Sequence, residues 1–236
     1  GLIWKVMNQV PEVRQAFQKA GFRDGTIQLS WPEPPVLRAS RLAQPISIDA
    51  DLSDWPQAFH NATLTEHHLE YGSVSDPQDL EGHLRFAWDE RYLYFQANVK
   101  DDAFVSRHLN QVIWRDDLVE LFIDPELDGL MWESSSDFQI GFRPNRDSRS
   151  VEMWSWFKAK GNPRDRGLEA KGIVTEDGYL IEGRIPWSFL GLTPQLGLVM
   201  GLSPAIHDSD SDRSEAKFNL FFRNSGAMNR YELAKL

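Results

Sequence analysis

Short runs in which hydrophobic and polar residues alternate, separated by turn signals, recur along most of this chain. Residues 83–88 alternate in this way, residues 89–91 form a turn signal, and residues 92–99 alternate again. Two such runs around a turn predict a β-hairpin. The same pattern predicts further strands at 46–48, 117–124, 136–143, 150–158, 168–175, 179–186, 198–206, 215–222 and 230–235. Many short strands at roughly even spacing predict an all-β fold, an antiparallel β-sandwich or jelly roll.

The first 39 residues follow a different pattern. Pro11 stands at the first turn of a helical pattern that runs to Ala20, and Gly21 ends it. The Pro-rich stretch 31–35 then predicts a stiff, extended linker. We therefore expect a short N-terminal helix with a linker over residues 1–39 and a β-sandwich domain over residues 40–236. Because the chain begins with Gly, we also expect a membrane tether or a larger parent protein upstream of residue 1.

The composition argues against several classes of function. A formal net charge of −10 would repel nucleic acid and anionic membranes, so neither is an expected partner. The absence of cysteine excludes disulfides, thiolate metal sites and cysteine nucleophiles. No P-loop, dinucleotide fingerprint or serine-hydrolase elbow occurs. Asp116, Asp117 and Glu120 stand too close in sequence to face each other across a substrate, so we expect no enzyme.

The stretch from Trp114 to Asp124 is the strongest functional signal in the sequence. Its strand pattern places three apolar residues at 119, 121 and 123 on one face, and Glu120 on the other face beside an aromatic residue. A flat indole near carboxylates suits sugars, which present apolar C–H faces and a rim of hydroxyls. The alternative is a sandwich strand whose glutamate is only solvated.

Five segments, taken in order, resemble the motifs of family 9 carbohydrate-binding modules. Residues 48–55 are similar to their opening IDG-x-LDD-W motif, and residues 87–102 to their W-D-x-x-Y-L-Y … V-x-D hairpin. Residues 114–124 resemble W-x-x-D-x-V-E-x-F-x-D, residues 182–187 resemble E-x-x-I-P-W, and residues 201–208 resemble G-x-N-x-x-x-x-D. The resemblance spans roughly residues 45–236. It implies a β-sandwich jelly roll, often with structural calcium, that binds the ends of sugar chains between two tryptophans.

The resemblance also implies roles for individual residues. Trp114 matches the first stacking tryptophan, and Glu120 matches an acid that binds sugar hydroxyls. The sequence departs from the family at two places: Gln139 stands where an arginine is expected, and residues 223–230 hold no second stacking tryptophan. Gln139 and Asn224, which lies in that second segment, are kept as candidate ligand-binding residues.

Trp154 and Trp156 stand two residues apart, so they would share one face of a strand. They are candidates to replace the missing stacking partner and join the candidate ligand-binding residues. The alternative is ordinary packing within a sheet.

Three acidic segments resemble places where a hard cation binds. Asp208, Asp210 and Asp212 present carboxylates at alternate positions, which predicts a structural calcium site. The alternative is a solvated acidic loop. The turn at 49–54 and the pair at 101–102 carry the same two interpretations.

Together these observations predict a non-catalytic, extracytoplasmic ligand-binding domain, periplasmic or at the cell surface. Its expected partner is carbohydrate, the end of an oligosaccharide or polysaccharide, and it would serve as the sensor domain of a membrane receptor or as an appendage of a carbohydrate-active enzyme. One alternative is a haem b electron-transfer subunit of the related DOMON-like type, with methionine and either histidine or lysine as haem ligands. Another is a structural or protein-interaction domain that kept the fold without the sugar site.

Overall fold

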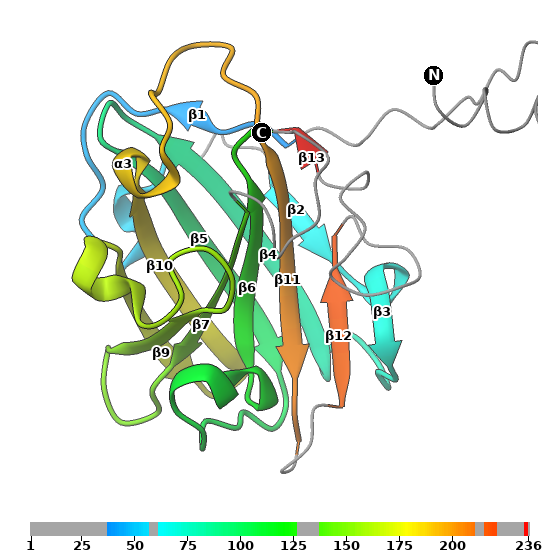
Figure 1. The fold of residues 1–236 in the computed structure, drawn as a ribbon. Coiled ribbons are helices and arrows are strands. Elements are labelled where there is room, and N and C mark those ends of the chain that lie inside the picture. The colour runs from blue at the N-terminus through cyan, green and yellow to red at the C-terminus, as the bar shows by residue number, and fades with distance from the viewer. Residues whose placement is uncertain (1–36, 57–60, 127–136, 211–214, 221–233, 236) are drawn as a thin grey trace, which may run out of the picture. The chain divides into compact units, whose positions relative to one another are not determined.

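A computed structural model describes residues 37–56, 61–126, 137–210, 215–220 and 234–235 of the chain (Figure 1). The chain divides into two compact units, residues 1–33 and residues 34–236, and every described residue belongs to the second. The helix expected over residues 11–20 lies outside the described residues. Within the described ranges, no helix is long and apolar enough to span a membrane.

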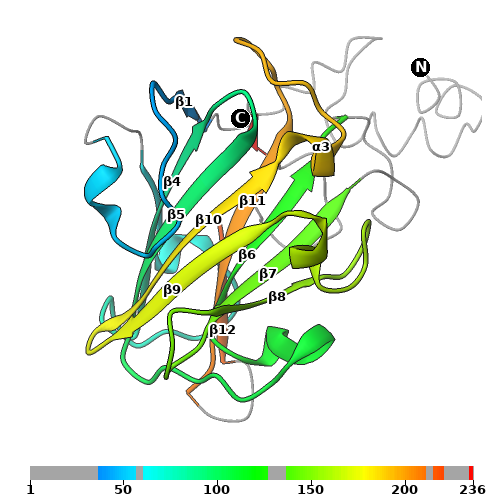
Figure 2. The same cartoon turned by 90° about the vertical axis from the view of Figure 1, so that its left-hand side faces the viewer.

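Two sheets pack face to face as a β-sandwich, which confirms the predicted fold class (Figure 2). In the described part of the chain, the first sheet has six strands in the order β1-β4-β5-β10-β9, with β2 also paired to β4. All of its pairings are antiparallel except that of β1 with β4. Its strands are β1 (Ser40–Arg41), β2 (Asn61–Leu64), β4 (Leu80–Trp88), β5 (Tyr92–Asp101), β9 (Glu169–Thr175) and β10 (Gly178–Pro186).

The second sheet positions the residues of functional interest. Among the described residues it has seven strands in the order β3-β12-β11-β6-β7-β8, with β13 also paired to β11, and all its pairings are antiparallel. The strands are β3 (Leu69–Gly72), β6 (Leu118–Asp124), β7 (Phe138–Pro144), β8 (Val151–Ser155), β11 (Gly201–Asp208), β12 (Ala216–Asn219) and β13 (Ala234–Lys235). The helices are short: η1 (Leu52–Asp54), η2 (Glu66–His68), η3 (Asn110–Arg115), η5 (Pro163–Arg166) and α3 (Trp187–Leu190).

The predicted hairpin at 83–99 is confirmed as β4 and β5, and Asp89 fixes its turn. One carboxylate oxygen of Asp89 accepts hydrogen bonds from the backbone N–H groups of Arg91 and Tyr92 at 2.7 and 2.8 Å. The other oxygen accepts from the buried Tyr94 hydroxyl at 2.8 Å. Because an aspartate that bonds the backbone ahead of it favours a turn, this residue sets the hairpin register.

The hydrophobic core lies between the two sheets. Val119, Leu121 and Ile123 of β6 all point into it and are fully buried, so the alternation predicted for this strand is confirmed. The prediction for the opposite face needs correction, since Leu118 and Phe122 on that face are fully buried as well. Both faces of β6 are therefore buried.

A second, smaller cluster covers part of the outer face of the six-stranded sheet. Ile46 and Trp55 pack there on Tyr94, so the expected strand at 46–48 is an irregular covering segment instead. Glu182 of β10 holds this segment by accepting hydrogen bonds from the Asp49 and Ala50 backbone N–H groups, each at 3.0 Å, and from the Trp55 indole. Burial raises the pKa of Glu182 despite these bonds.

The acidic turn at 49–54 has local structural roles. The Asp51 carboxylate accepts from the Ser53 N–H at the start of η1, and the Asp54 carboxylate accepts from the Ser47 N–H. No group of described residues suited to a metal ion includes them. The turn is thus explained by capping of the backbone.

Candidate functional site

Glu120 of β6 lies at the centre of a buried polar network on the outer face of the seven-stranded sheet. It is 0% exposed. The Gln139 side-chain amide donates to one carboxylate oxygen. The other oxygen lies 3.0 Å from Nε2 of His207 and 2.9 Å from Nζ of Lys217. Of the residues predicted from sequence, the structure therefore brings Glu120 and Gln139 into direct contact.

The strand register explains why these side chains meet. Glu120 is paired with Ala205 on β11 and with Gly141 on β7, so its immediate neighbours on this face are small. Gln139 and His207 each stand two residues from one of these small residues, and alternation places them on the same face. Small neighbours leave room for the longer side chains to reach the carboxylate.

Lys217 extends the network to the edge of the sheet. It is paired with His207 across β11 and β12, and its ammonium lies 3.5 Å from a carboxylate oxygen of Glu70 on β3. The Asn219 amide donates to the same Glu70 oxygen at 3.3 Å, and the Ser203 hydroxyl donates to Asn219. The network thus runs from β7 to β3.

The opposite charges in this network keep its buried groups ionised although burial disfavours ionised groups. Burial alone would raise the pKa of Glu120, but the charge of Lys217 and the contacts with His207 and Gln139 hold it well below its usual range. Burial would likewise lower the pKa of Lys217, whereas Glu120 and Glu70 raise it above its usual value. Glu120 is therefore an ionised carboxylate that can accept further hydrogen bonds.

Trp156 lies over this face beside Glu120. A Cβ atom added to Gly141, the strand partner of Glu120, would come within 2.6 Å of the Trp156 ring. The Trp156 indole N–H donates to the Gln111 backbone carbonyl at 3.0 Å, which ties the ring to η3. Trp154 pairs with Gly141 across β8, and its indole nitrogen is buried with no hydrogen-bond partner among the described residues.

Trp114 stands in η3, the helix that precedes β6. Its side chain is 42% exposed, and the Arg115 guanidinium lies 5.2 Å from its ring centroid. The preceding residue, Ile113, is buried and reaches the space above Gly141 that the Trp156 ring also approaches. No hydrogen bond joins Trp114 to Glu120 in the described structure. Asn224 lies outside the described residues.

His207 and Lys217 were missed by sequence reasoning. A signal existed for His207, which continues the Ser203 and Ala205 face of a strand whose other face is apolar. The contact of Lys217 with Glu120 depends on β11 lying between β12 and β6, and that strand order leaves no pattern in the sequence.

A second polar cluster gathers carboxylates where β5 and β11 end and β6 begins, at the lower end of the sandwich in Figure 1. Asp208 belongs to two groups, one with Asp79 and Asp210 and the other with Asp101 and Asp117. The oxygen atoms within each group lie within 4.8 Å of one another. The predicted ligands Asp208 and Asp210 are thus joined by residues from other segments, while Asp212 lies outside the described residues.

The carboxylates of this cluster fit a calcium ion. One oxygen each of Asp101 and Asp117 and both oxygens of Asp208 are buried without a hydrogen-bond partner among the described residues. Burial, together with the neighbouring acids, raises the pKa of Asp101 to about 6, of Asp117 to about 10 and of Asp208 to about 8. Calcium prefers clustered carboxylate oxygens at about 2.3–2.6 Å, so oxygens on opposite sides of one ion stand about 4.8 Å apart.

Haem ligation would need an available histidine or methionine. The described ones contact other protein groups or are buried in the core, and the others lie outside the described residues. Five described histidines contact other protein groups through a ring nitrogen: His67 with Glu66, His68 with Thr65, His83 with Glu81, His108 with Asp116, and His207 with Glu120. Met153 and Met200 are buried in the core, and His60 and Met228 are not described. No observation on the described residues favours haem ligation.

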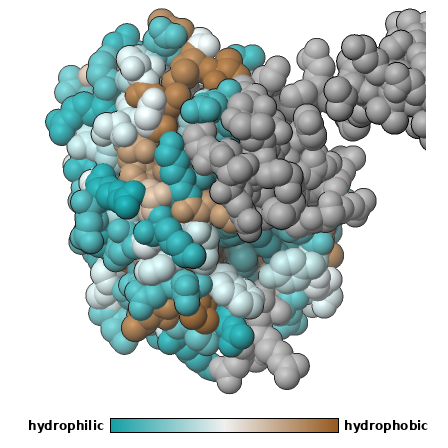
Figure 3. Space-filling model, viewed as in Figure 1, coloured by the Kyte–Doolittle hydropathy of each residue, from teal (hydrophilic) through white to brown (hydrophobic). Residues whose placement is uncertain are grey.

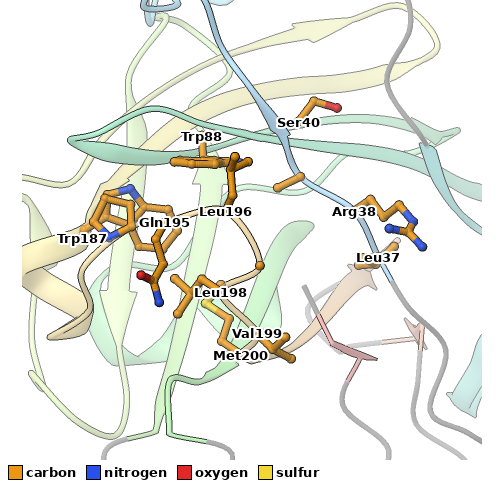
Figure 4. A pocket seen from close by; sticks show the side chains of 13 residues that line it. Leu37, Arg38, Ser40, Trp88, Trp187, Gln195, Leu196, Leu198, Val199 and Met200 are labelled. Atoms are coloured by element: carbon orange, nitrogen blue, oxygen red, sulfur yellow. The ribbon is translucent and has the colours of Figure 1, made fainter.

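An apolar groove of about 470 Å³ opens at the other end of the sandwich, between the segment before β1 and the segment before β11 (Figure 4). Its walls include Trp88, Trp187, Leu198 and Met200, and its polar groups come from Arg38, Ser40 and Gln195. Leu196 of this groove is 77% exposed, and Figure 3 shows hydrophobic residues gathered at this end of the visible face. Because the groove offers few hydrogen-bonding groups, a hydroxyl-rich ligand is better matched by the Glu120 network.

Comparison with family models and curated proteins gives consistent matches. Residues 48–226 match the model described as carbohydrate family 9 binding domain-like. The chain is 27% identical over 128 residues to endo-1,4-beta-xylanase A of Thermoanaerobacterium saccharolyticum, covering 54% of this chain and 10% of that protein. It is 32% identical over 127 residues to endo-1,4-beta-xylanase A of Thermotoga maritima, covering 54% and 11%. The chain thus spans about a tenth of the length of these relatives.

Solved structures show the same fold. A carbohydrate binding module family 9 from Caldicellulosiruptor kristjanssonii in complex with cellotriose matches with a TM-score of 0.66 at 21% identity, covering 84% of this chain and 90% of that chain. The same module in complex with glucose matches with a TM-score of 0.65 at 22% identity, covering 84% and 93%.

Proposed function

This chain belongs to the carbohydrate family 9 binding domain-like family, and on that premise we propose that its sandwich binds carbohydrate without catalysing a reaction. The bound group would be the end of an oligosaccharide or polysaccharide. The observation that carries the proposal is the Glu120 network, in which an ionised carboxylate and an amide meet on one sheet face beside tryptophans. Such a set offers acceptors and donors for hydroxyls together with flat apolar surfaces.

The network suits an uncharged sugar. Its buried carboxylates, Glu120 and Glu70, outnumber its one lysine, Lys217, so an anionic group would meet a net negative site. Trp114 is the better candidate for a stacking platform because it is the exposed indole, whereas Trp156 is fixed by packing over Gly141. Stacking plus a few hydrogen bonds predicts weak binding, with Kd on the order of 10 μM to 1 mM.

We also propose that the module works outside the cytoplasm as part of a larger carbohydrate-active enzyme. Support comes from the matched relatives, which are named as xylanases and of which this chain covers about a tenth. A role as the sensor domain of a membrane receptor is the second version of this proposal. Expression of the full-length parent gene followed by fractionation would separate the two, because a receptor would sediment with membranes.

We further propose that Asp101, Asp117 and Asp208 hold a structural calcium ion, with Asp79 and Asp210 contributing on the Asp208 side. When bound, the ion would supply positive charge that offsets the mutual repulsion of these carboxylates. The residues come from both sheets, so the same contacts would tie the sheets together at this end.

The proposed function is tested by a glycan array followed by calorimetry on Trp114→Ala. We expect the wild-type protein to bind at least one neutral glycan, and the substitution to weaken that binding about tenfold to thirtyfold, as the loss of a tryptophan anchor does. Leu196→Ala is the matched control, since Leu196 is 77% exposed in the apolar groove at the other end of the sandwich. A wild-type protein that binds no glycan would overturn the function. Unchanged affinity in the Trp114 variant would overturn the stacking role alone.

A further inference from the structure

His207 carries an unused hydrogen-bonding group next to the proposed site. The residue is 4% exposed, and its Nδ1 atom is buried without a hydrogen-bond partner among the described residues. Its other ring nitrogen, Nε2, lies 3.0 Å from Glu120. A buried polar atom without a partner is costly, so native structures rarely keep one that nothing satisfies.

The contact with Glu120 determines what Nδ1 can do. Glu120 is ionised and accepts hydrogen bonds from Lys217 and Gln139, so it cannot donate to the imidazole. Nε2 of His207 must therefore carry the hydrogen in this contact. In the neutral imidazole, Nδ1 is then a lone-pair acceptor and needs a donor from outside the network.

A second orphaned group lies on the same sheet face. The indole nitrogen of Trp154, an obligatory donor, is also buried and has no partner among the described residues. Trp154 pairs with Gly141, which pairs with Glu120, and His207 lies on the opposite side of Glu120. One sheet face thus holds an unsatisfied acceptor next to Glu120 and an unsatisfied donor two strands away from it. A hydroxyl group both donates and accepts, and it carries no charge into a site of net negative charge.

We propose, on the basis of the carbohydrate-binding function above, that His207 is a ligand-binding residue whose Nδ1 accepts a hydrogen bond from a sugar hydroxyl. Glu120 fixes the ring by holding Nε2–H, in the way that a carboxylate behind a ligand-binding histidine selects its tautomer. Lys217 is a positioning residue, because it keeps Glu120 an acceptor and so keeps the shared hydrogen on Nε2 of the ring. The ligand class is a neutral, hydroxyl-rich sugar.

The substitution His207→Gln separates this role from a structural one. A glutamine amide nitrogen stands near the place of Nε2, so it preserves a donor to Glu120 but offers no acceptor where Nδ1 was. We expect the variant to melt within a few degrees of the wild type and to bind cellotriose about fivefold to tenfold more weakly, the loss expected for one neutral hydrogen bond. His83→Gln, on β4 of the other sheet, is the matched control and should leave affinity unchanged.

Nitrogen-detected NMR of the wild-type imidazoles gives a readout that does not depend on a folded variant. Addition of cellotriose should shift the Nδ1 resonance of His207 far more than its Nε2 resonance. If cellotriose does not bind, the tightest glycan of the array takes its place. Sugar binding that leaves both the Nδ1 resonance and the affinity of His207→Gln unchanged would overturn this proposal while leaving the function intact. A wild-type protein that binds no glycan would overturn the function itself.

Discussion

At the scale of single residues, Lys217 is the residue on which the polar network most depends. It is the cation that compensates two buried carboxylates, Glu120 and Glu70. We expect Lys217→Met to destabilise the fold by about 3–5 kcal/mol, because removing one partner leaves the others buried without compensation. Urea unfolding measures the loss. Lys100→Met, which breaks a half-exposed ion pair with Glu81, should cost less than about 1 kcal/mol. Equal losses in the two variants would contradict the assignment.

The ionised state of Glu120 gives a prediction for pH dependence. Its pKa in the folded protein lies below the unfolded value of about 4.3, so the carboxylate contributes stability above about pH 4.3 that is lost as pH falls toward the lower folded pKa. In Glu120→Gln this contribution is absent at every pH. The stability difference between wild type and variant should therefore narrow as urea titrations move from about pH 6 to pH 3. A difference that stays constant over that range would refute the depressed pKa.

Sequence reasoning reached part of this residue-level picture. Alternation along 118–124 correctly separated the core side chains from Glu120, since the period of a strand is fixed by its geometry. It did not reveal that Glu120 is fully buried, because burial on the second face depends on side chains from β7, β11 and β12. Those contacts are set by strand order, which hydrophobic periodicity does not encode.

At the scale of elements, the segment from Ile46 to Trp55 covers the sheet, and Glu182 accepts three hydrogen bonds from it. Glu182→Ala would remove the acceptor of the Asp49 N–H, of the buried Ala50 N–H and of the Trp55 indole N–H. We expect a loss of about 2–4 kcal/mol, together with faster hydrogen exchange at Asp49 and Ala50. Glu169→Ala, which removes a partly exposed ion pair with Arg184, is the control and should cost less than about 1 kcal/mol. Unchanged exchange rates in Glu182→Ala would show that other contacts hold the segment.

Element boundaries were predictable where turn chemistry is local. The strands predicted at 168–175 and 179–186 form as β9 and β10, because Glu176 and Asp177 make a tight turn between them and Gly178 follows it at a φ of 134°. The segment at 46–48 was wrongly predicted as a strand because its apolar residues pack on Tyr94 from outside the sheet. Alternation of apolar residues indicates only that one side of a segment is buried. A strand and an irregular covering segment can therefore show the same pattern.

At the scale of the whole molecule, the two-sheet architecture followed from the spacing of strands and turns, whereas the acidic cluster did not. Asp208 and Asp101 were recognisable as members of acidic segments. Their meeting with Asp79 and Asp117 requires the ends of strands from both sheets to converge, which only the assembled sandwich provides. Contacts at the end of a sandwich join residues that are far apart in sequence. Local sequence patterns therefore identify individual candidate metal ligands but not the complete group of carboxylates.

With the proposed calcium ion in the acidic cluster, we expect the stability of the sandwich to depend on calcium. An ion bound only by the folded state at about a hundred times its Kd adds about 2.7 kcal/mol, which for a chain of this size corresponds to a rise in Tm of about 5–10 °C. Differential scanning fluorimetry in calcium and in EDTA at pH 7 measures this rise.

Asp208→Asn should abolish the response, since Asp208 is common to both carboxylate groups. The same variant should melt above the wild type in EDTA, because burial raises the pKa of Asp208 to about 8, and folding at pH 7 must otherwise bind a proton there. Asp51→Asn is the matched control: asparagine preserves the cap of η1, so its calcium response should equal that of the wild type. A wild-type Tm that is the same in calcium and EDTA would exclude the ion. The buried carboxylates would then have to be neutralised by protonation alone.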